Sequence, residues 1–171
     1  MELIQTTSVG AGGASSITFT SIPATYTDLW LMVNVRSGSN NDTLFLRVNG
    51  STASTTSAYM EGNGASVSSG SSTTNTFVRF GTITSAASAD TFSSARAYLP
   101  NYTSSANKTV TTDYVSENNN TTAYQTLVAG VFPITDAITS LTISNTGGSL
   151  AAYSSASLYG VKNGSGGATV S

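Results

Sequence analysis

The chain has 171 residues, a net charge of −2 and only 8% charged residues, which predicts one domain with a surface of hydroxyl and amide groups. Its six basic residues are scattered and no apolar run is long enough to span a bilayer, so we expect neither nucleic acid nor a membrane as a partner. Because histidine and cysteine are absent, the chain has no imidazole base, no thiol nucleophile and no zinc-thiolate site.

Apolar and polar residues alternate with a period of two along most of the chain, and helical periodicity is nearly absent. This pattern predicts an all-β fold, an antiparallel, jelly-roll-like β-sandwich of about nine or ten short strands with little or no helix. In chain order the predicted strands are 16–20, 27–37, 43–50, 76–83, 95–99, 109–115, 124–132, 140–144 and 156–161.

The sequence between these strands predicts how the domain is organised. Residues 1–163 form one β-sandwich domain, and 164–171 form a flexible Gly/Ser tail. Residues 50–76 are predicted as a long Ser/Thr/Gly-rich loop or an edge strand, either mobile or ordered by another subunit.

Two kinds of connection are also predicted. Asn49-Gly50 is a strong hairpin signal, because both residues tolerate a positive φ. Each of the segments 22–28 and 132–140 contains a proline followed by threonine and aspartate, and is expected to form at most a helical turn.

One predicted strand is apolar on both faces. Trp30 and Met32 alternate with Leu29, Leu31 and Val33, so they point to the opposite side of the strand. Either Trp30 is covered by a loop of its own chain, or this second apolar face meets a partner. We therefore take Trp30 and Met32 as candidate interface residues.

Three further residues are candidates for partner contact. Arg47 lies in a strand where arginines and aromatic residues alternate, so it is predicted to stack on aromatic rings or to lie on a solvated face. Tyr59 is one of the few large side chains within 50–76, and Tyr102 lies in the predicted loop 99–105, where it is expected to be exposed.

No constellation of residues predicts catalysis. Asp113 and Glu117 are four residues apart in a predicted strand and therefore about 13 Å apart, whereas glycosidase carboxylates lie about 5–10 Å apart. We predict no catalytic residues, no metal site and no cofactor, and therefore a protein that is not an enzyme.

Three blocks of the sequence resemble small β-rich virion proteins of tailed bacteriophages, especially cyanobacterial and marine phages. They are FTSIPATYTDLWLMVNVRS at 19–37, LFLRVNGST at 44–52 and ASLYGVKNG at 156–164, which together make up 37 of the 171 residues. The resemblance implies a virion structural protein, assembled in the host cytoplasm, and it brings no catalytic residues.

Within that class, two functions are expected. The first is a capsid decoration, or cement, protein that binds capsid protein or other virion subunits and stabilises the head by non-covalent contacts, as a homo-oligomer and by preference a trimer. The alternative is a tail-fibre or receptor-binding module that recognises a host surface glycan, which a surface rich in tyrosine, serine, threonine and asparagine suits.

Overall fold

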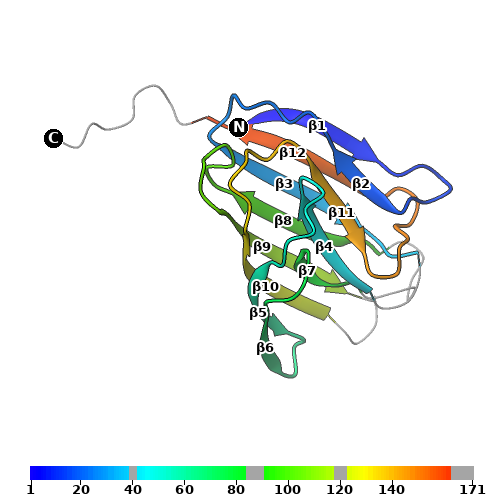
Figure 1. The fold of residues 1–171 in the computed structure, drawn as a ribbon. Helices are drawn as coiled ribbons and strands as arrows, with labels where there is room; N and C mark the ends of the chain where they lie inside the picture. Colours follow the sequence, from blue (N-terminus) through cyan, green and yellow to red (C-terminus); the bar gives the residue numbers. More distant parts are fainter. Residues whose placement is uncertain (39–41, 84–90, 118–122, 163–171) are drawn as a thin grey trace.

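The computed structural model describes residues 1–38, 42–83, 91–117 and 123–162, and these residues form strands and no helix (Figure 1). The all-β prediction is confirmed, with twelve described strands instead of nine or ten. Nothing in the described part is a helix long and apolar enough to cross a membrane. The strands are β1 (Glu2–Ser8), β2 (Ser16–Phe19), β3 (Asp28–Val35), β4 (Asp42–Val48), β5 (Thr56–Gly62), β6 (Val67–Ser72), β7 (Val78–Ile83), β8 (Ser93–Leu99), β9 (Lys108–Glu117), β10 (Ala123–Phe132), β11 (Leu141–Asn145) and β12 (Ser155–Val161).

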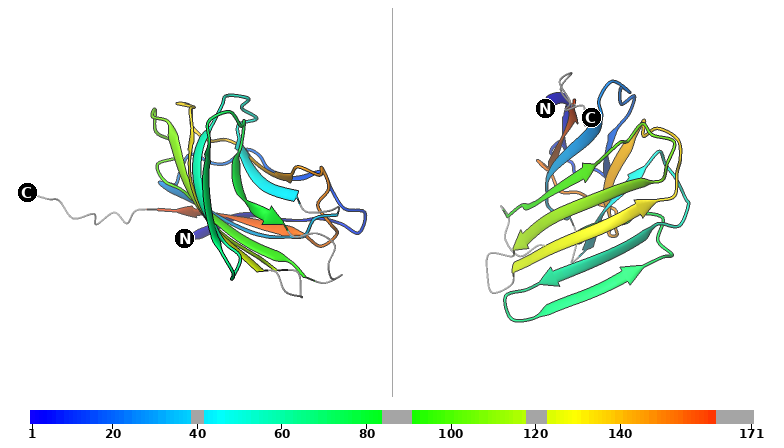
Figure 2. Two further views of the ribbon diagram at one scale, coloured as in Figure 1. Left: turned by 90° about the horizontal axis from the view of Figure 1, so that it is seen from below. Right: turned by 90° about the vertical axis from the view of Figure 1, so that its left-hand side faces the viewer.

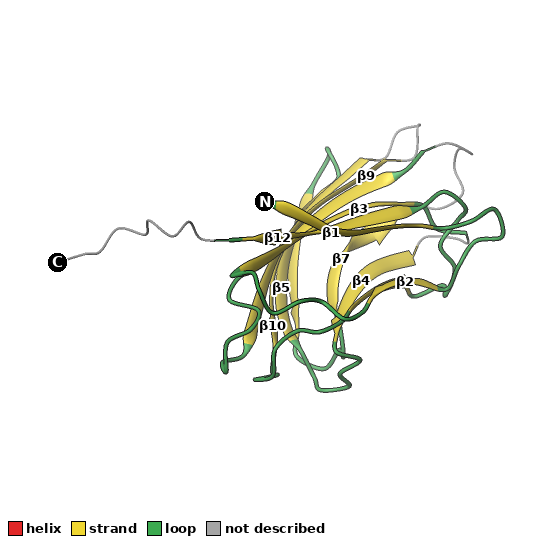
Figure 3. Cartoon of the chain, turned by 90° about the horizontal axis from the view of Figure 1, so that it is seen from above, coloured by secondary structure: helices red, strands yellow, loops and turns green. Residues whose placement is uncertain are grey.

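The strands form two antiparallel sheets that face each other as an open sandwich (Figures 2 and 3). The large sheet has eight strands in the order β1-β12-β3-β8-β9-β10-β5-β6. The small sheet has four strands in the order β2-β11-β4-β7. Every strand pair in the structure is antiparallel, as the predicted sandwich requires.

The hydrophobic core lies between the two sheets and follows the alternation in the sequence. On β3 the inward residues Leu29, Leu31, Val33 and Val35 are almost fully buried. The small sheet supplies Phe19, Leu44, Leu46, Phe80 and Ile143 from its own inner face. Because a strand turns alternate side chains to opposite faces, this arrangement leaves Trp30 and Met32 on the outer face of the large sheet.

The hairpin predicted at Asn49-Gly50 is wrong, although the turn itself forms. Both residues have a positive φ, 51° and 60°, and the Ser51 amide donates to the Val48 carbonyl at 2.9 Å. The turn, however, joins strands of different sheets, because β4 pairs with β11 and β7 whereas β5 pairs with β10 and β6. Asn49 Oδ1 accepts from the backbone amides of Thr139 and Ser140, so this side chain ties the turn to the chain that leads into β11.

Of the two alternatives predicted for 50–76, a long loop or an edge strand, the structure has the edge strand. Residues 56–62 and 67–72 are strands β5 and β6, and β6 is the edge of the large sheet. Strand β1 was not predicted; 22–28 and 132–140 contain no helix, and within 22–28 Ala24 and Thr25 lie in a turn. The predicted tail 164–171 lies outside the described residues.

Candidate interaction surface

The outer face of the large sheet, meaning its side chains that point away from the small sheet, exposes several large apolar residues. Met32, Met60, Val115 and Leu127 are 48%, 57%, 47% and 45% exposed. They come from β3, β5, β9 and β10, which are far apart in the sequence. Single exposed apolar residues are ordinary, but a group of them on one face marks a site of interaction.

The strand register places outer side chains of five neighbouring strands in one row. Met60 lies opposite Leu127, Leu127 opposite Asp113, Asp113 opposite Arg96, and Arg96 opposite Met32. The row crosses β5, β10, β9, β8 and β3 in that order. It therefore has apolar side chains at both ends and an ion pair in the middle, and we call it the central row.

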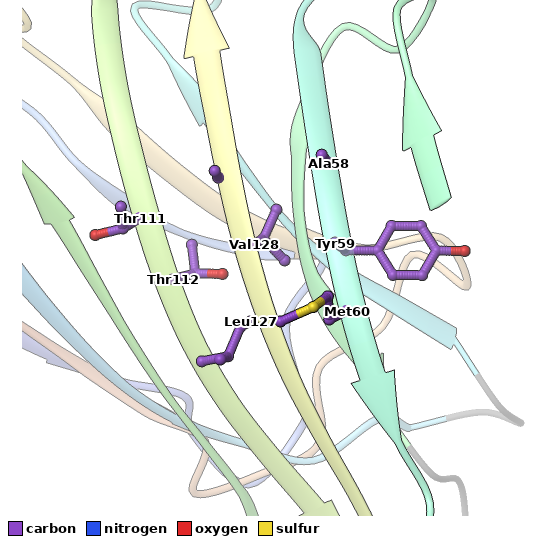
Figure 4. Close-up of a pocket in the computed structure, with 8 residues that line it drawn as sticks. Ala58, Tyr59, Met60, Thr111, Thr112, Leu127 and Val128 are labelled. Atoms are coloured by element: carbon purple, nitrogen blue, oxygen red, sulfur yellow. The ribbon is translucent and has the colours of Figure 1, made fainter. Parts of the chain in front are cut away.

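An apolar hollow opens at the β5 end of the central row (Figure 4). Its volume is about 380 Å³, and its outward-facing walls are Ala58, Met60, Thr111, Leu127 and Ala129. The hollow forms because small side chains at Ala58 and Ala129 lie side by side in the register, next to the long side chains of Met60 and Leu127. Such a hollow can accept an apolar side chain from a partner.

Aromatic side chains from three neighbouring strands form a second row on the same face. Tyr98 lies opposite Trp30, and Trp30 opposite Tyr159, all of them half-buried. The rings of Trp30 and Tyr98 are 5.5 Å apart between centroids and tilted by 54°. The Tyr98 hydroxyl donates to the buried Asp28 carboxylate at 2.8 Å, and this hydrogen bond raises the pKa of Tyr98. Asp28 thereby holds Tyr98 in place, and we call these three rings the aromatic row.

The ion pair in the middle of the central row is open to solvent. Arg96 Nε donates to Asp113 Oδ2 at 2.9 Å, and the two side chains are 57% and 31% exposed. At such exposure the pair adds little to folding stability, but its unused donors and acceptors can bind a partner. Asp113 is thus engaged by an arginine from the next strand.

Arg47 lies on the opposite side of the molecule from Trp30 and Met32, on the outer face of the small sheet. Its guanidinium is 4.8 Å from the ring centroid of Phe45 and 5.6 Å from that of Phe77, which confirms the predicted stacking on aromatic rings. The two rings are themselves stacked, 4.3 Å apart. Arg47 and Trp30 therefore cannot belong to one contact surface.

Tyr59 is half-buried and holds strand β6 in place. Its ring lies against Gly70, where an added Cβ would come within 2.7 Å of the Tyr59 hydroxyl. The Arg79 guanidinium lies 4.2 Å from the ring centroid and also binds Glu61 at 2.9 Å, while Thr126 donates to the same carboxylate. Tyr59 is thus part of a packed cluster between β5, β7 and β10.

The prediction that Tyr102 is an exposed loop residue is wrong. Its side chain is fully buried, with the hydroxyl donating to the Pro23 carbonyl and accepting from the Tyr26 amide. Burial raises the pKa of Tyr102, since the phenolate would lose its hydration. The tyrosine joins two connecting segments at one end of the sandwich, so it cannot contact a partner.

Of the five candidates, the structure brings together only Trp30 and Met32, and it adds residues that sequence reasoning missed. Leu127 alternates with Val128 in a segment that is apolar on both faces, which is the same signal that identified Trp30. Tyr98, Arg96 and Met60 carry no such signal, because their proximity to Trp30 and Leu127 depends on which strands pair.

Three buried polar residues, Ser37, Asp42 and Asn145, form a structural cluster. Ser37 donates to Asp42 Oδ2 at 2.5 Å, and Asn145 Nδ2 donates to the same oxygen at 3.1 Å and to the Ser149 carbonyl at 2.9 Å. These hydrogen bonds tie the β11–β12 connection to β4. Within the described ranges, no group of aspartate and glutamate side chains is arranged to hold a metal ion.

The outer face of the large sheet is therefore the candidate surface for binding a partner. Comparison with protein-family models, with curated proteins and with solved structures gives no match for this chain.

Proposed function

We propose that this chain is a non-enzymatic virion structural protein, a capsid decoration protein that binds the phage head through the outer face of its large sheet. The observation that carries the proposal is the central row, where exposed Met32, Met60 and Leu127 flank one ion pair. The sequence resemblance to phage virion proteins supports the virion as the place of action and capsid protein as the partner.

The chemistry of this face fits attachment to an assembled shell. Interface centres are enriched in tryptophan, tyrosine, methionine and arginine, all of which the face contains. With 8% charged residues in the chain, such contacts depend mainly on apolar burial, which salt screens little. A protein that binds only the assembled lattice stabilises that lattice by mass action.

The test is binding to purified, expanded heads of the parent phage. Leu127→Lys places a charge beside the apolar hollow and should weaken binding by roughly 30-fold, because a buried interface anchor contributes about 2 kcal/mol. The readout is the number of bound chains per head across a concentration series. Thr18→Lys, an exposed substitution on the small sheet, is the control and should bind like the parent chain. Equal binding by Leu127→Lys and the parent would refute the proposal.

A second candidate is favoured by the aromatic row. Tyr98, Trp30 and Tyr159 present rings beside the exposed Arg96–Asp113 pair, and a depression of about 430 Å³ lies between Trp30 and the pair. Aromatic rings stack on the apolar faces of sugars, while a guanidinium and a carboxylate bind hydroxyls. This arrangement fits a tail-fibre or receptor-binding module for a host surface glycan.

Trp30 is the only tryptophan in the chain, so its fluorescence tests the glycan candidate directly. Titration with defined oligosaccharides should give a saturable change in emission and slower quenching by acrylamide. Tyr98→Ala should weaken binding by roughly tenfold, through the loss of about 1.4 kcal/mol of ring contact. Tyr153→Ala, at a 73% exposed ring outside the sheets, should leave binding unchanged. An unchanged Trp30 signal with every sugar would exclude this candidate.

A further inference from the structure

Strand β6 is an edge strand that nothing in the described chain covers on its outer edge. It pairs with β5 through six consecutive residue pairs, from Ser57–Ser72 to Gly62–Val67. Most of its side chains are exposed, and Val67 is 80% exposed. Figures 1 and 2 show β6 at the end of the large sheet, beyond the small sheet. One side of its backbone is therefore open to hydrogen bonding with another strand.

The two edges of the large sheet differ in their protection. Strand β1 has a register shift between Leu3 and Gln5, and it carries Glu2, whose carboxylate is 3.5 Å from the Lys162 ammonium. A bulge and a charge are features by which proteins prevent edge-to-edge pairing. Strand β6 has the sequence VSSGSS, without a charge, a proline or a register shift.

The open edge is also held rigid from within. Tyr59 packs on Gly70, Arg79 stacks on Tyr59, and Arg79 and Thr126 both bind Glu61. These contacts join the β5–β6 hairpin to the sandwich, so a strand that pairs with β6 meets a pre-ordered edge and the conformational entropy cost of pairing is reduced.

We propose that β6 pairs with β6 of a second copy of this chain, antiparallel and about a two-fold axis. Two copies of β6 bring no like charges together, and apart from Val67 the strand contains only serine and glycine, which are small enough to lie side by side on either face of the sheet. Pairing through β6 uses the open edge of the large sheet in each copy. The other edge, β1, is protected, so the large sheet adds no third copy and the assembly is a pair.

This inference goes beyond the proposed function, because it concerns how copies join and not what they bind. In the pair the two large sheets become one continuous sheet, and the two apolar hollows, which border β5, lie on either side of the axis. Two linked copies would bind a repeating surface with a higher avidity than one. A two-fold pair also differs from the trimer expected from the resemblance.

The test is the mass of the full chain in solution, measured by light scattering or sedimentation over a concentration series. The parent chain should have the mass of two 17.4 kDa chains. Ser69, an exposed residue in the middle of β6, lies close to the axis in the proposed pair. Ser69→Lys and Ser69→Glu should each raise the dissociation constant of the pair at least tenfold, through repulsion between like charges.

Mixing the two variants separates a charge effect from damage to the fold. An equal mixture of Ser69→Lys and Ser69→Glu should again form pairs, because opposite charges then meet at the axis. Gln5→Lys, the matched change on the protected edge strand β1, should pair like the parent chain. Three results would each overturn the proposal: a parent chain that stays single, a mass of three chains, or pairs of Ser69→Lys as tight as those of the parent. Binding to heads or sugars is measured in separate experiments, so a failure of the proposed function can be told from a failure of this inference.

Discussion

Replacing Tyr114 by alanine should lower the free energy of unfolding by about 4 kcal/mol, since truncating a buried aromatic residue costs about 3–5 kcal/mol. Tyr114 is on β9 in the large sheet and is fully buried. Its ring passes over Gly81 of β7, where an added Cβ would be 2.2 Å from the ring, and its hydroxyl donates to the Thr82 carbonyl at 3.1 Å. One side chain therefore joins the two sheets.

Equilibrium unfolding in guanidinium chloride measures this effect. Tyr153→Ala removes the same atoms from a ring that is 73% exposed and should change the free energy of unfolding by less than about 0.5 kcal/mol. A loss below about 1 kcal/mol for Tyr114→Ala would contradict the packing of this ring between the sheets.

The Tyr114 hydroxyl also makes stability depend on pH. Burial raises the pKa of Tyr114 from 10.0 to about 12, because the phenolate would lose its hydration. Between these values the unfolded chain releases the phenolic proton while the folded chain keeps it, so the free energy of unfolding falls as pH rises; below pH 10 both states keep it. Across this window the parent should lose up to about 1.4 kcal/mol per pH unit more than Tyr114→Phe. Parallel curves for the two proteins between pH 10 and 12 would contradict the raised pKa.

Replacing Lys108 by methionine should lower the free energy of unfolding by about 2 kcal/mol, through the loss of charge-assisted hydrogen bonds. The Lys108 side chain is buried, and its ammonium donates to the carbonyls of Ser104 and Ala106, both at 2.6 Å. The carbonyls of Ile134 and Thr135 lie 3.4 Å away. Burial lowers the pKa of Lys108, and these four oxygens take the place of the water that the ammonium has lost.

The chain contains a natural control for this change. Lys162, the other lysine, has a side chain that is 60% exposed, so Lys162→Met should change the free energy of unfolding by less than about 0.5 kcal/mol. Hydrogen exchange locates the effect: amides in 100–107 and 133–136 should exchange faster in Lys108→Met than in the parent, while those of β3 stay protected. Equal stability of the two methionine variants would show that Lys108 does not hold these segments together.

The strands that sequence reasoning located are those where alternation is strong. Residues 27–37 and 124–132 alternate between a buried and an exposed face, and they became β3 and β10. The sequence left both a loop and an edge strand open for 50–76, because the β6 segment consists of serine, glycine and one valine, with no apolar face. The segment is a strand because its backbone pairs with β5 and because Tyr59 packs on Gly70. Both contacts are made by residues outside the segment.

The interaction surface was predicted less completely than the fold, and the errors share one cause. Tyr102 was expected to be exposed because it follows proline and asparagine in a polar segment, but the folded chain encloses it between two connections. Conversely, Trp30 was identified from its place in a doubly apolar strand, whereas its neighbour Tyr98 was not. Exposure and proximity at these positions are properties of the packed chain.

By itself the sequence determined that this protein is built from antiparallel strands, and that Leu31 and Val33 are buried opposite Trp30 and Met32. Both follow from the period-two geometry of a strand, which is local to each segment. Only the tertiary structure decided that Trp30 lies beside Tyr98, that Leu127 lies beside Met60, and that β6 is left at an open edge. Strand pairing joins distant segments, and in a chain where about a third of the residues are serine or threonine, many pairings satisfy the same alternation until the whole core is packed.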